Sequence, residues 1–475
     1  MGAWAGLGCV GSFLIAVAGP RAVADAASPW WYQPSLGGKA LSTALVYTGI
    51  AVLCAAWIGL GRHAAGEDTT PLILIAVLWL VPLALGPALF SRDAYSYLAQ
   101  GTVLHIGANP YRTAPGALAG GAHAPLLAAV SPFWRHTTAP YGPLFLGIMS
   151  VIVGITGNHL VAGILLTRVV ELAAVALLAV QVPRLARALG ADPSRALWLA
   201  VLNPLVALEL VAAAHNDVLM AALLVAGLTA ALRGRPVWGI ALCALAGTLK
   251  LPALAGAVFI AVAWAREERG TAAMLRFGAA AAAAAAVTLA AVSVVTGVGA
   301  SWLSASVLAT PARVHLAVTP STQIGYTLAS LAHDLGLGVS TRGAESAVGS
   351  VTLAACALLG VLLAVRVRVR TVVPFTGWLL LAAAALGPAA WPWYFCWALP
   401  LLAACRDVQR LSVLWIGSVA AVLVIKPNGI LALPQSSAPA VLAVYAALAG
   451  LWWAARRGGP GRGLTARSHS ALVGT

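Results

Sequence analysis

Asp93 has the clearest capacity for acid–base chemistry of any residue in the chain, because of where it stands. It lies three positions after an apolar run that ends at Phe90, within the segment S-R-D-A-Y-S-Y. A carboxylate at the edge of such a run is expected at a bilayer surface, where partial burial raises its pKa and lets it act as a general base. A helix-capping aspartate paired with Arg92 explains the position equally well, so position alone leaves both interpretations open.

A second group of polar residues, His215, Asn216 and Asp217, interrupts an apolar stretch. The group follows V-A-A-A and is followed at once by V-L-M-A-A-L-L-V. Ionisable groups near hydrocarbon are costly, so we expect these side chains to face a cavity on the same side as Asp93. Asn216 alone could be the cap of the next helix, but a cap does not explain His215.

Two cations are candidates for binding a phosphate group. Lys250 stands alone between two short apolar runs that Pro252 separates, and an unpaired ammonium there needs an anion such as a lipid phosphate. A lysine that extends its side chain to the interface is an equal alternative. Arg112, in N-P-Y-R, could bind phosphate with two parallel hydrogen bonds, although any exposed loop arginine has the same pattern.

The remaining chemical groups carry weaker signals. Trp393 and Tyr394 lie in W-P-W-Y at an expected membrane boundary, where an aromatic belt is the default explanation and sugar stacking the minority one. The six cysteines lie in or beside apolar runs without a CxxC pair, which is typical of packing residues. The sequence has no phosphate-binding glycine loop, zinc cluster or Ser/His/Asp set, so we expect neither a metal nor another cofactor.

The elements that position these groups must be membrane helices. Of 475 residues, 61% are hydrophobic and 9% are charged, whereas soluble domains carry about 25% charged residues. Because lipid offers no hydrogen bonds, the spans of this all-α integral membrane protein should be helices, about thirteen to fifteen in number. We place them near 4–24, 40–60, 71–90, 143–180, 195–213, 217–232, 236–250, 252–265, 273–297, 346–365, 371–389, 392–405, 411–426 and 438–455.

The arginines indicate which ends of the helices face the cytoplasm. The net charge of +15 is concentrated in short breaks between apolar runs, as the positive-inside rule describes, and no basic stripe suggests a nucleic-acid partner. This orientation places 91–142 and 298–345 outside and requires 143–180, which Gly157 and Asn158 divide, to make an odd number of crossings. The clusters are Arg184 and Arg187, Arg233 and Arg235, Arg266 and Arg269, Arg366, Arg368 and Arg370, Arg406 and Arg410, and Arg456 and Arg457.

The domain organisation follows from these spans. Residues 1–455 are expected to form one polytopic domain, followed by a disordered cytoplasmic tail at 456–475. Within 298–345, Leu328, Leu331 and Leu335 have helical spacing, which favours a helix lying at the interface.

Abundant Ala, Gly, Val and Arg with only three lysines is typical of a GC-rich bacterial genome, which suggests a bacterial plasma membrane.

Several motifs along 92–402, taken in order, resemble one known family. The chain is similar to the GT-C class of polytopic glycosyltransferases, and more narrowly to the actinobacterial polyprenol-phosphomannose-dependent α-(1→6)-mannosyltransferases of the MptB type. The motifs are R-D-A-Y-S-Y-L-A-Q-G at 92–101, N-P-Y-R at 109–112, A-P-Y-G-P-L at 139–144, N-P-L-V-A-L-E-L-V-A-A-A-H-N-D-V-L-M at 203–220, L-K-L-P-A-L at 249–254 and W-P-W-Y-F-C-W-A-L-P-L-L at 391–402.

The resemblance implies a mechanism and a role for each candidate residue. It implies a polyprenyl-phosphate mannose donor, a growing α-(1→6)-mannan or lipoglycan acceptor, and inversion at the anomeric carbon on the extracytoplasmic face. Asp93 occupies the place of the family's acidic loop residue and would be the base, while Lys250 and Arg112 would bind the donor phosphate. Tyr95 stands where many GT-C enzymes have a second acidic residue, so a metal-binding pair is not supported. The expected substrate-binding residues are Tyr95, Tyr97, Asn109, Tyr111, Tyr141, His215, Asn216, Asp217, Trp393 and Tyr394.

Two other functions fit a chain with many spans. A transporter or flippase of lipid-linked sugars would show broken helices with ionisable residues at mid-membrane, whereas here the polar residues gather toward one face. A lipid-linked glycan polymerase or ligase would share the topology.

Overall fold

The expected all-α architecture is confirmed over the part of the chain that the structure describes. The computed structural model describes residues 1–23, 30–32, 37–304, 319–387, 391–429, 442–447, 449, 450 and 453, and these residues form helices joined by turns and loops, with no β-sheet. The expected tail at 456–475 lies outside these residues, as does most of the expected span at 438–455.

Six described helices are long and apolar enough to cross a membrane, or seven if a broken pair counts as one span. Several spans that we expected from the sequence are instead apolar helices of 10–17 residues, so this number is smaller than the thirteen to fifteen predicted. The six are α1 (Gly2–Val23), α2 (Lys39–Gly61), α8 (Leu160–Ala188), α13 (Thr271–Val295), α16 (Thr341–Arg366) and Val369–Leu386, which contains α17 (Val372–Leu386). The shorter ones are α3 (Thr70–Leu85), α7 (Pro143–Thr156), α11 (Pro236–Gly247), Leu251–Ala265, which contains α12 (Leu254–Ala265), and α19 (Ser412–Val422).

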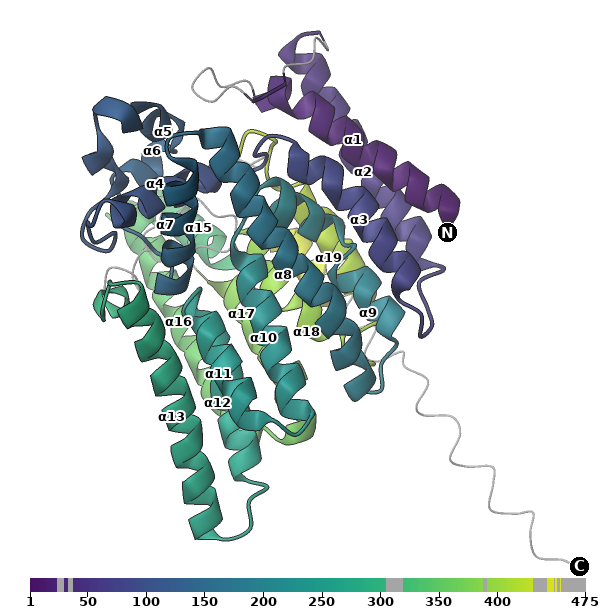
Figure 1. The fold of residues 1–475 in the computed structure, drawn as a ribbon, viewed down its shortest axis with the longest axis vertical. Coiled ribbons are helices and arrows are strands. Elements are labelled where there is room, and N and C mark those ends of the chain that lie inside the picture. The colour runs from purple at the N-terminus through teal and green to yellow at the C-terminus, as the bar shows by residue number, and fades with distance from the viewer. Residues whose placement is uncertain are drawn as a thin grey trace, which may run out of the picture.

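Two of the long helices expose almost their whole apolar surface. In α13 only 6% of the most apolar window is buried in the protein, and in α16 only 11%. An apolar helix with so little protein around it would be unstable in water, but lipid solvates it while its backbone closes its own hydrogen bonds. Both helices are therefore lipid-facing, and Figure 1 shows α13 at the edge of the bundle.

The long apolar stretch at 143–180 is divided as the sequence suggests. It forms α7 and α8, and the turn between them contains Gly157 with φ of 56°, a conformation that favours glycine. Asn158 in this turn pairs with His123 of the preceding loop at 2.9 Å, so the C-terminal end of α7 lies beside that loop. Of the two, α8 is long and apolar enough to cross a membrane, whereas α7 is one of the shorter apolar helices.

The two ends of the bundle differ in chemistry. At one end, the loop 91–142 folds into α4 (Asp93–His105), α5 (Ala124–Ala129) and α6 (Pro132–Arg135), which lie together in Figure 1. At the other end, arginine side chains bind neighbouring loops: Arg187 pairs with Glu67 at 3.0 Å, and Arg266 donates to the Val367 carbonyl at 2.8 Å. The loop that contains Asp93 and the arginine-rich loops thus lie at opposite ends of the molecule (Figure 1).

The helix expected in the second long loop is present as α15 (Pro320–Asp334). Thr319 caps its N-terminus by accepting from the Thr322 amide. Leu328 and Leu331 expose 49% and 53% of their surface along one face, which suits a helix at an apolar interface.

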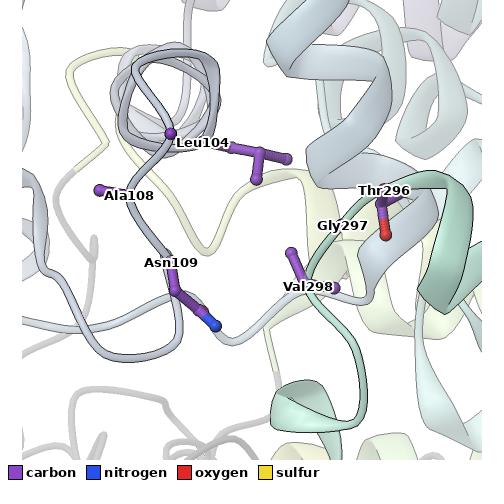
Figure 2. Close-up of a pocket in the computed structure, with 7 residues that line it drawn as sticks. Leu104, Ala108, Asn109, Thr296, Gly297 and Val298 are labelled. Atoms are coloured by element: carbon purple, nitrogen blue, oxygen red, sulfur yellow. The ribbon is translucent and has the colours of Figure 1, made fainter.

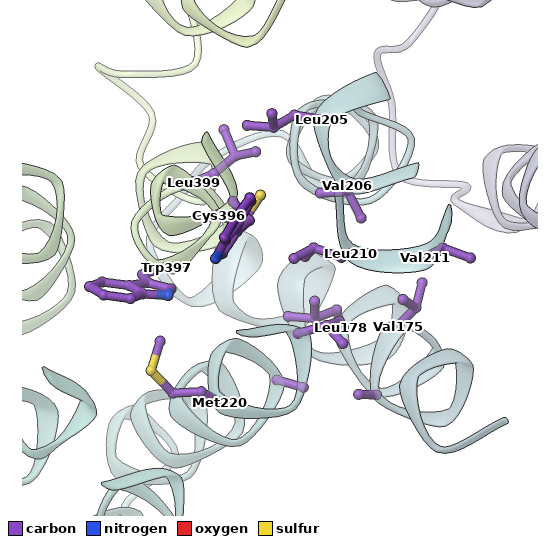
Figure 3. Close-up of a cluster of buried hydrophobic side chains, with 14 of the residues drawn as sticks. Val175, Leu178, Leu205, Val206, Leu210, Val211, Met220, Cys396, Trp397 and Leu399 are labelled. Carbon is purple, nitrogen blue, oxygen red and sulfur yellow. The ribbon is translucent and has the colours of Figure 1, made fainter. Parts of the chain in front are cut away.

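The centre of the bundle contains a helix that breaks. The π-helix Val206–Ala212 meets α10 (Asp217–Leu232) at an angle of 114°, and Ala214 between them has φ of 61°. Figure 3 shows apolar side chains around this break, contributed by the π-helix, α8, α10 and the segment that follows Cys396. A non-glycine residue with positive φ is strained, and such strain is commonly retained next to functional sites.

Arg168 of α8 binds the backbone at this break. Its guanidinium group is 1% exposed and donates to five carbonyl oxygens. Two of them, Val211 and Ala212, end the π-helix, while Ala84, Gly86 and Pro87 lie at the end of α3. Carbonyls at helix ends have no partner in their own helix, so Arg168 satisfies both ends and holds them together.

Arg168→Met should therefore destabilise the protein strongly. Loss of the donors leaves several buried carbonyls unpaired, and we expect the free energy of unfolding to fall by about 3–5 kcal/mol. Thermal unfolding of the purified protein in detergent would measure this. Arg276→Met on exposed α13 is the matched control, and equal melting temperatures for the two variants would contradict the role given to Arg168.

Candidate active site

Asp93 is the first residue of α4, and its two carboxylate oxygens have different surroundings. Oδ1 accepts a hydrogen bond of 2.8 Å from the Trp134 indole, while Oδ2 lies 3.8 Å from Nε2 of His215. The side chain is only 14% exposed. Burial raises the pKa of Asp93 to about 6, although the Trp134 bond and the positive charge of Lys250 act in the opposite direction. A carboxyl group with this pKa is suited to general-base catalysis near neutral pH.

The loop before Asp93 is held in a strained conformation. Phe90 has φ of 65°, its N–H donates to the Pro427 carbonyl at 2.8 Å, and the Leu89 N–H donates to the Ala212 carbonyl at 3.2 Å. The Arg92 guanidinium donates to the carbonyls of Ala128 and Ala129. The backbone on both sides of Asp93 is thus fixed by segments distant in sequence.

His215 lies in the helix break and is fully buried. Its ring stacks on the Trp393 indole with centroids 3.7 Å apart, and Nδ1 is 2.6 Å from the Glu209 carbonyl oxygen. Stacking and this hydrogen bond fix the plane of the ring, so Nε2 faces Asp93.

Lys250 and Asp217 form a buried ion pair beside Asp93. Nζ of Lys250 is 2.6 Å from Oδ1 of Asp217, and the Trp397 indole donates to the same oxygen. The Lys250 side chain is 11% exposed, so it does not extend to solvent as the alternative interpretation requires. Its ammonium also lies 5.0–5.8 Å from the ring centres of Tyr141, Tyr394 and Trp397, which stabilise a cation.

The position of Lys250 depends on a close backbone contact. The Gly142 N–H donates to the Leu249 carbonyl at 3.0 Å, and the Leu144 N–H donates to Thr248 at 3.1 Å. A Cβ atom at position 142 would lie 2.0 Å from the Thr248 oxygen, so only glycine fits there.

The other loop residues that we expected to bind substrate have structural partners in this conformation. The Tyr111 hydroxyl donates to the Tyr141 carbonyl at 2.8 Å, and the Tyr97 ring meets the Tyr141 ring edge-on at 5.0 Å. Asn109 accepts from the Tyr111 N–H and donates to the Ser301 hydroxyl. Tyr95 is also buried. These residues build the wall beside Asp93.

A cavity of about 210 Å³ lies at the C-terminal end of α4, and Asn109 is part of its lining. Figure 2 shows Leu104, Ala108 and Asn109 on one side and Thr296, Gly297 and Val298 on the other.

The structure does not bring every candidate into the cluster. Arg112 is exposed in the loop after α4, and among the described residues its only hydrogen bond is made by its backbone N–H, to Asn109. Asn216 stands at the N-cap position of α10, yet its side chain makes no capping bond. The cap interpretation therefore accounts for the position of Asn216 but not for its amide.

Sequence reasoning missed four residues of this region: Trp134, Trp397, Glu209 and Arg168. Glu209 and Arg168 are charged residues inside apolar runs, and the cost of burying charge in a membrane was a signal that could have identified both. The two tryptophans carry no such signal, because their partners are 41 and 180 positions away.

Several buried polar atoms near the helix break have no hydrogen-bond partner within the described ranges. They are the Asn216 amide, Oδ2 of Asp217, Nε2 of His215 and both carboxyl oxygens of Glu209. Buried polar atoms are nearly always paired, so a cluster of unpaired ones suits a site that binds hydroxyl groups of a ligand.

Comparisons with known proteins match most of the chain. A family model described as "Alpha-(1->6)-mannopyranosyltransferase, N-terminal domain" matches residues 5–266, and a second described as "MptB C-terminal domain" matches 321–457. No solved structure matches the chain.

Curated relatives come from mycobacteria and corynebacteria. The chain is 38% identical to alpha-(1→6)-mannopyranosyltransferase A of Mycobacterium tuberculosis, over 82% of this chain and 77% of that protein. It is 33% identical to a probable alpha-(1→6)-mannopyranosyltransferase of Mycolicibacterium smegmatis, over 84% and 78%. It is 30% identical to alpha-(1→6)-mannopyranosyltransferase B of Corynebacterium glutamicum, over 88% and 75%.

The Lys250–Asp217 pair predicts strong coupling in a double-mutant cycle. Lys250→Met or Asp217→Asn alone leaves a buried group of the opposite charge unpaired, which typically costs about 3–5 kcal/mol. The double variant should lose less than the sum of the two, by about 1–3 kcal/mol, in the free energy of unfolding. Additive losses would show that the two side chains do not interact in the folded protein.

Proposed function

The chain belongs to the alpha-(1→6)-mannopyranosyltransferase family, and from that premise we propose that it transfers mannose from a polyprenyl-phosphate carrier to a growing α-(1→6)-mannan or lipoglycan. It is a multi-pass membrane mannosyltransferase. The observation that carries the proposed mechanism is the cluster in which the Asp93 carboxylate lies beside a buried lysine ammonium. The base can deprotonate the attacking hydroxyl group, while the cation stabilises the phosphate that leaves.

The proposed reaction is a single displacement that inverts the anomeric carbon. Asp93 removes the proton of an acceptor hydroxyl, and the oxygen attacks the anomeric carbon as the bond to the phosphate oxygen breaks. Polyprenyl phosphate leaves with that electron pair. One base suffices, because inversion forms no covalent intermediate with the enzyme.

Lys250 is the proposed ligand of the donor phosphate. An ammonium carries three donors, so binding to Asp217 leaves others for phosphate oxygens. A cation held in a buried site stabilises the negative charge that develops on the leaving group more strongly than it would in water. Arg112, whose side chain makes no bond among the described residues, is proposed as a second phosphate ligand.

The proposed sugar site lies between aromatic and polar side chains. Tyr141, Trp393 and Tyr394 offer ring faces for the sugar, while Asn216 and Asp217 offer unpaired atoms to its hydroxyl groups. Tyr95, Tyr97, Asn109 and Tyr111 complete the proposed set by shaping the loop wall.

The distribution of arginines supports an extracytoplasmic active site. The arginine-rich loops lie at the end of the bundle opposite Asp93, and such loops face the cytoplasm under the positive-inside rule. We therefore propose that the reaction takes place on the outer face of a bacterial plasma membrane.

The bent pair at 206–232 is the observation that favours a second candidate function. Broken helices with polar residues at the break are typical of transporters, so a flippase of lipid-linked sugars is the alternative. A flippase moves the lipid without breaking the sugar–phosphate bond, and therefore needs no base.

Asp93→Asn should abolish transfer of radiolabelled mannose from polyprenyl-phosphate mannose to an α-(1→6)-mannan primer in membranes. Loss of a general base typically lowers the rate by about 10²–10⁴-fold. Asp334→Asn, which alters an exposed carboxylate of α15, is the matched control and should keep wild-type activity. Undiminished transfer by Asp93→Asn at equal expression would remove Asp93 from the mechanism, whereas an absence of transfer by the wild-type protein would favour the flippase.

The raised pKa of Asp93 predicts an acid limb in the pH profile. A base works when it is deprotonated, so kcat/KM should fall about tenfold per pH unit below about 6 and reach a plateau above it. Initial rates between pH 4.5 and 8 would measure this limb. A limb near the usual aspartate pKa of about 4 would mean that burial does not tune this carboxyl group.

A further inference from the structure

The hydrogen bond at Nδ1 determines which protons His215 carries. Nδ1 lies 2.6 Å from the Glu209 carbonyl oxygen, and a carbonyl oxygen can only accept, so Nδ1 carries a hydrogen. The ring is fully buried, which favours its neutral form. In a neutral imidazole with hydrogen on Nδ1, Nε2 has a lone pair and can only accept.

The helix break creates this arrangement. In the π-helix the Ala213 N–H donates to the Leu208 carbonyl, and the positive φ of Ala214 then ends the helix. The Glu209 carbonyl accepts from the His215 side chain. Single π-turns inside longer helices occur frequently at functional sites.

The accepting nitrogen faces the proposed base. Nε2 has no hydrogen-bond partner in the described structure and lies 3.8 Å from Oδ2 of Asp93, while Oδ1 is already bound by Trp134. While Asp93 is ionised, Oδ2 and Nε2 are both acceptors and cannot form a hydrogen bond with each other. This accounts for the distance of 3.8 Å between them. When Oδ2 gains a proton it becomes a donor, and a movement of about 1 Å gives a normal hydrogen bond.

We propose that His215 is a positioning residue that acts through Asp93, by accepting a hydrogen bond from the carboxyl group once it has taken the acceptor's proton. This inference rests on the proposed role of Asp93 as the base. The acceptor O–H bond breaks, its proton forms an O–H bond at Oδ2, and its electron pair forms the new bond to the anomeric carbon. The proton on Oδ2 then points at Nε2, which remains unprotonated.

A partner that binds only the protonated form makes Asp93 a stronger base. Other titratable groups around Asp93 and His215 also affect the protonation of Asp93, and substitutions of His215 leave these groups in place. Lys250 favours the ionised form of Asp93 and Asp217 disfavours it. The remaining groups are the Glu209 carboxyl, 3.9 Å from Nδ1, and the buried hydroxyls of Tyr97, Tyr141 and Tyr394.

Two substitutions test the roles of the two ring nitrogens of His215 separately. In His215→Asn the amide can still donate to the Glu209 carbonyl, but no acceptor reaches Asp93. In His215→Gln the longer side chain can place its oxygen where Nε2 lies. Both variants lose the imidazole, but the asparagine keeps the donor to the Glu209 carbonyl and the glutamine keeps the acceptor toward Asp93, so an effect is assigned to one nitrogen or the other.

The test is the pH profile of mannose transfer by the full-length protein in detergent or liposomes. His215→Asn should move the acid limb of kcat/KM down by about 0.5–1 pH unit, the effect of one hydrogen bond, and lower the plateau rate about 3- to 10-fold. His215→Gln should keep the wild-type limb. The KM for the lipid donor should stay the same in both, because the phosphate site is not altered.

A limb that stays at the wild-type pH in His215→Asn would overturn the proposal, as would identical profiles for the two variants. A purely structural role would lower the rate in proportion to the amount of folded protein, without moving the limb. Failure of the proposed function is recognised separately, because the wild-type protein would then show no mannose transfer, and failure of Asp93 as the base would leave transfer by Asp93→Asn intact in the same assay.

Discussion

The backbone carbonyls at the end of the broken helix impose the constraint on which the rest of the structure depends. In an apolar bundle these groups cannot be solvated by water, so each needs a partner from the protein. Arg168 supplies donors for Val211 and Ala212, Leu89 supplies its N–H to Ala212, and His215 binds Glu209. Because these partners come from α8, from the end of α3 and from the break itself, satisfying the carbonyls also brings the site together.

The electrostatics of the site follow from the same constraint. A lysine and two carboxylates placed at the rim of an apolar bundle must either pair or shift their protonation. Lys250 pairs with Asp217, which leaves Asp93 with the Trp134 indole, the Ser91 hydroxyl and a buried imidazole as polar neighbours. The division gives one carboxylate a structural role and keeps the other available as a base.

The sequence predicted those features that follow from the free-energy cost of placing charged groups in an apolar environment. The low charge content predicted a helical membrane protein, and the cost of burying His215 and Asp217 predicted that they lie on the same side as Asp93. The structure places both near Asp93, together with Lys250, which pairs with Asp217 and not with a lipid phosphate or the interface. Within the described residues, fewer helices are long enough to span a membrane than the sequence predicted, because short apolar helices such as α11 and α19 have the composition of a span without its length. The Trp134 and Trp397 bonds could not be predicted, since they depend on how distant loops fold over the helix ends. The acceptor geometry of His215 also depends on a positive φ at Ala214, and an alanine carries no sequence signal for that conformation.

In the proposed reaction, Asp93 and Lys250 lie on either side of the bond that breaks. A cryo-EM structure of the Asp93→Asn protein with bound polyprenyl-phosphate mannose tests this claim most directly. The account predicts phosphate oxygens in contact with Nζ of Lys250, the mannose among Tyr141, Trp393 and Tyr394, and its anomeric carbon on the path from the phosphate to position 93. A donor whose phosphate is bound by the arginine-rich loops at the opposite end, or whose sugar lies away from position 93, would contradict it.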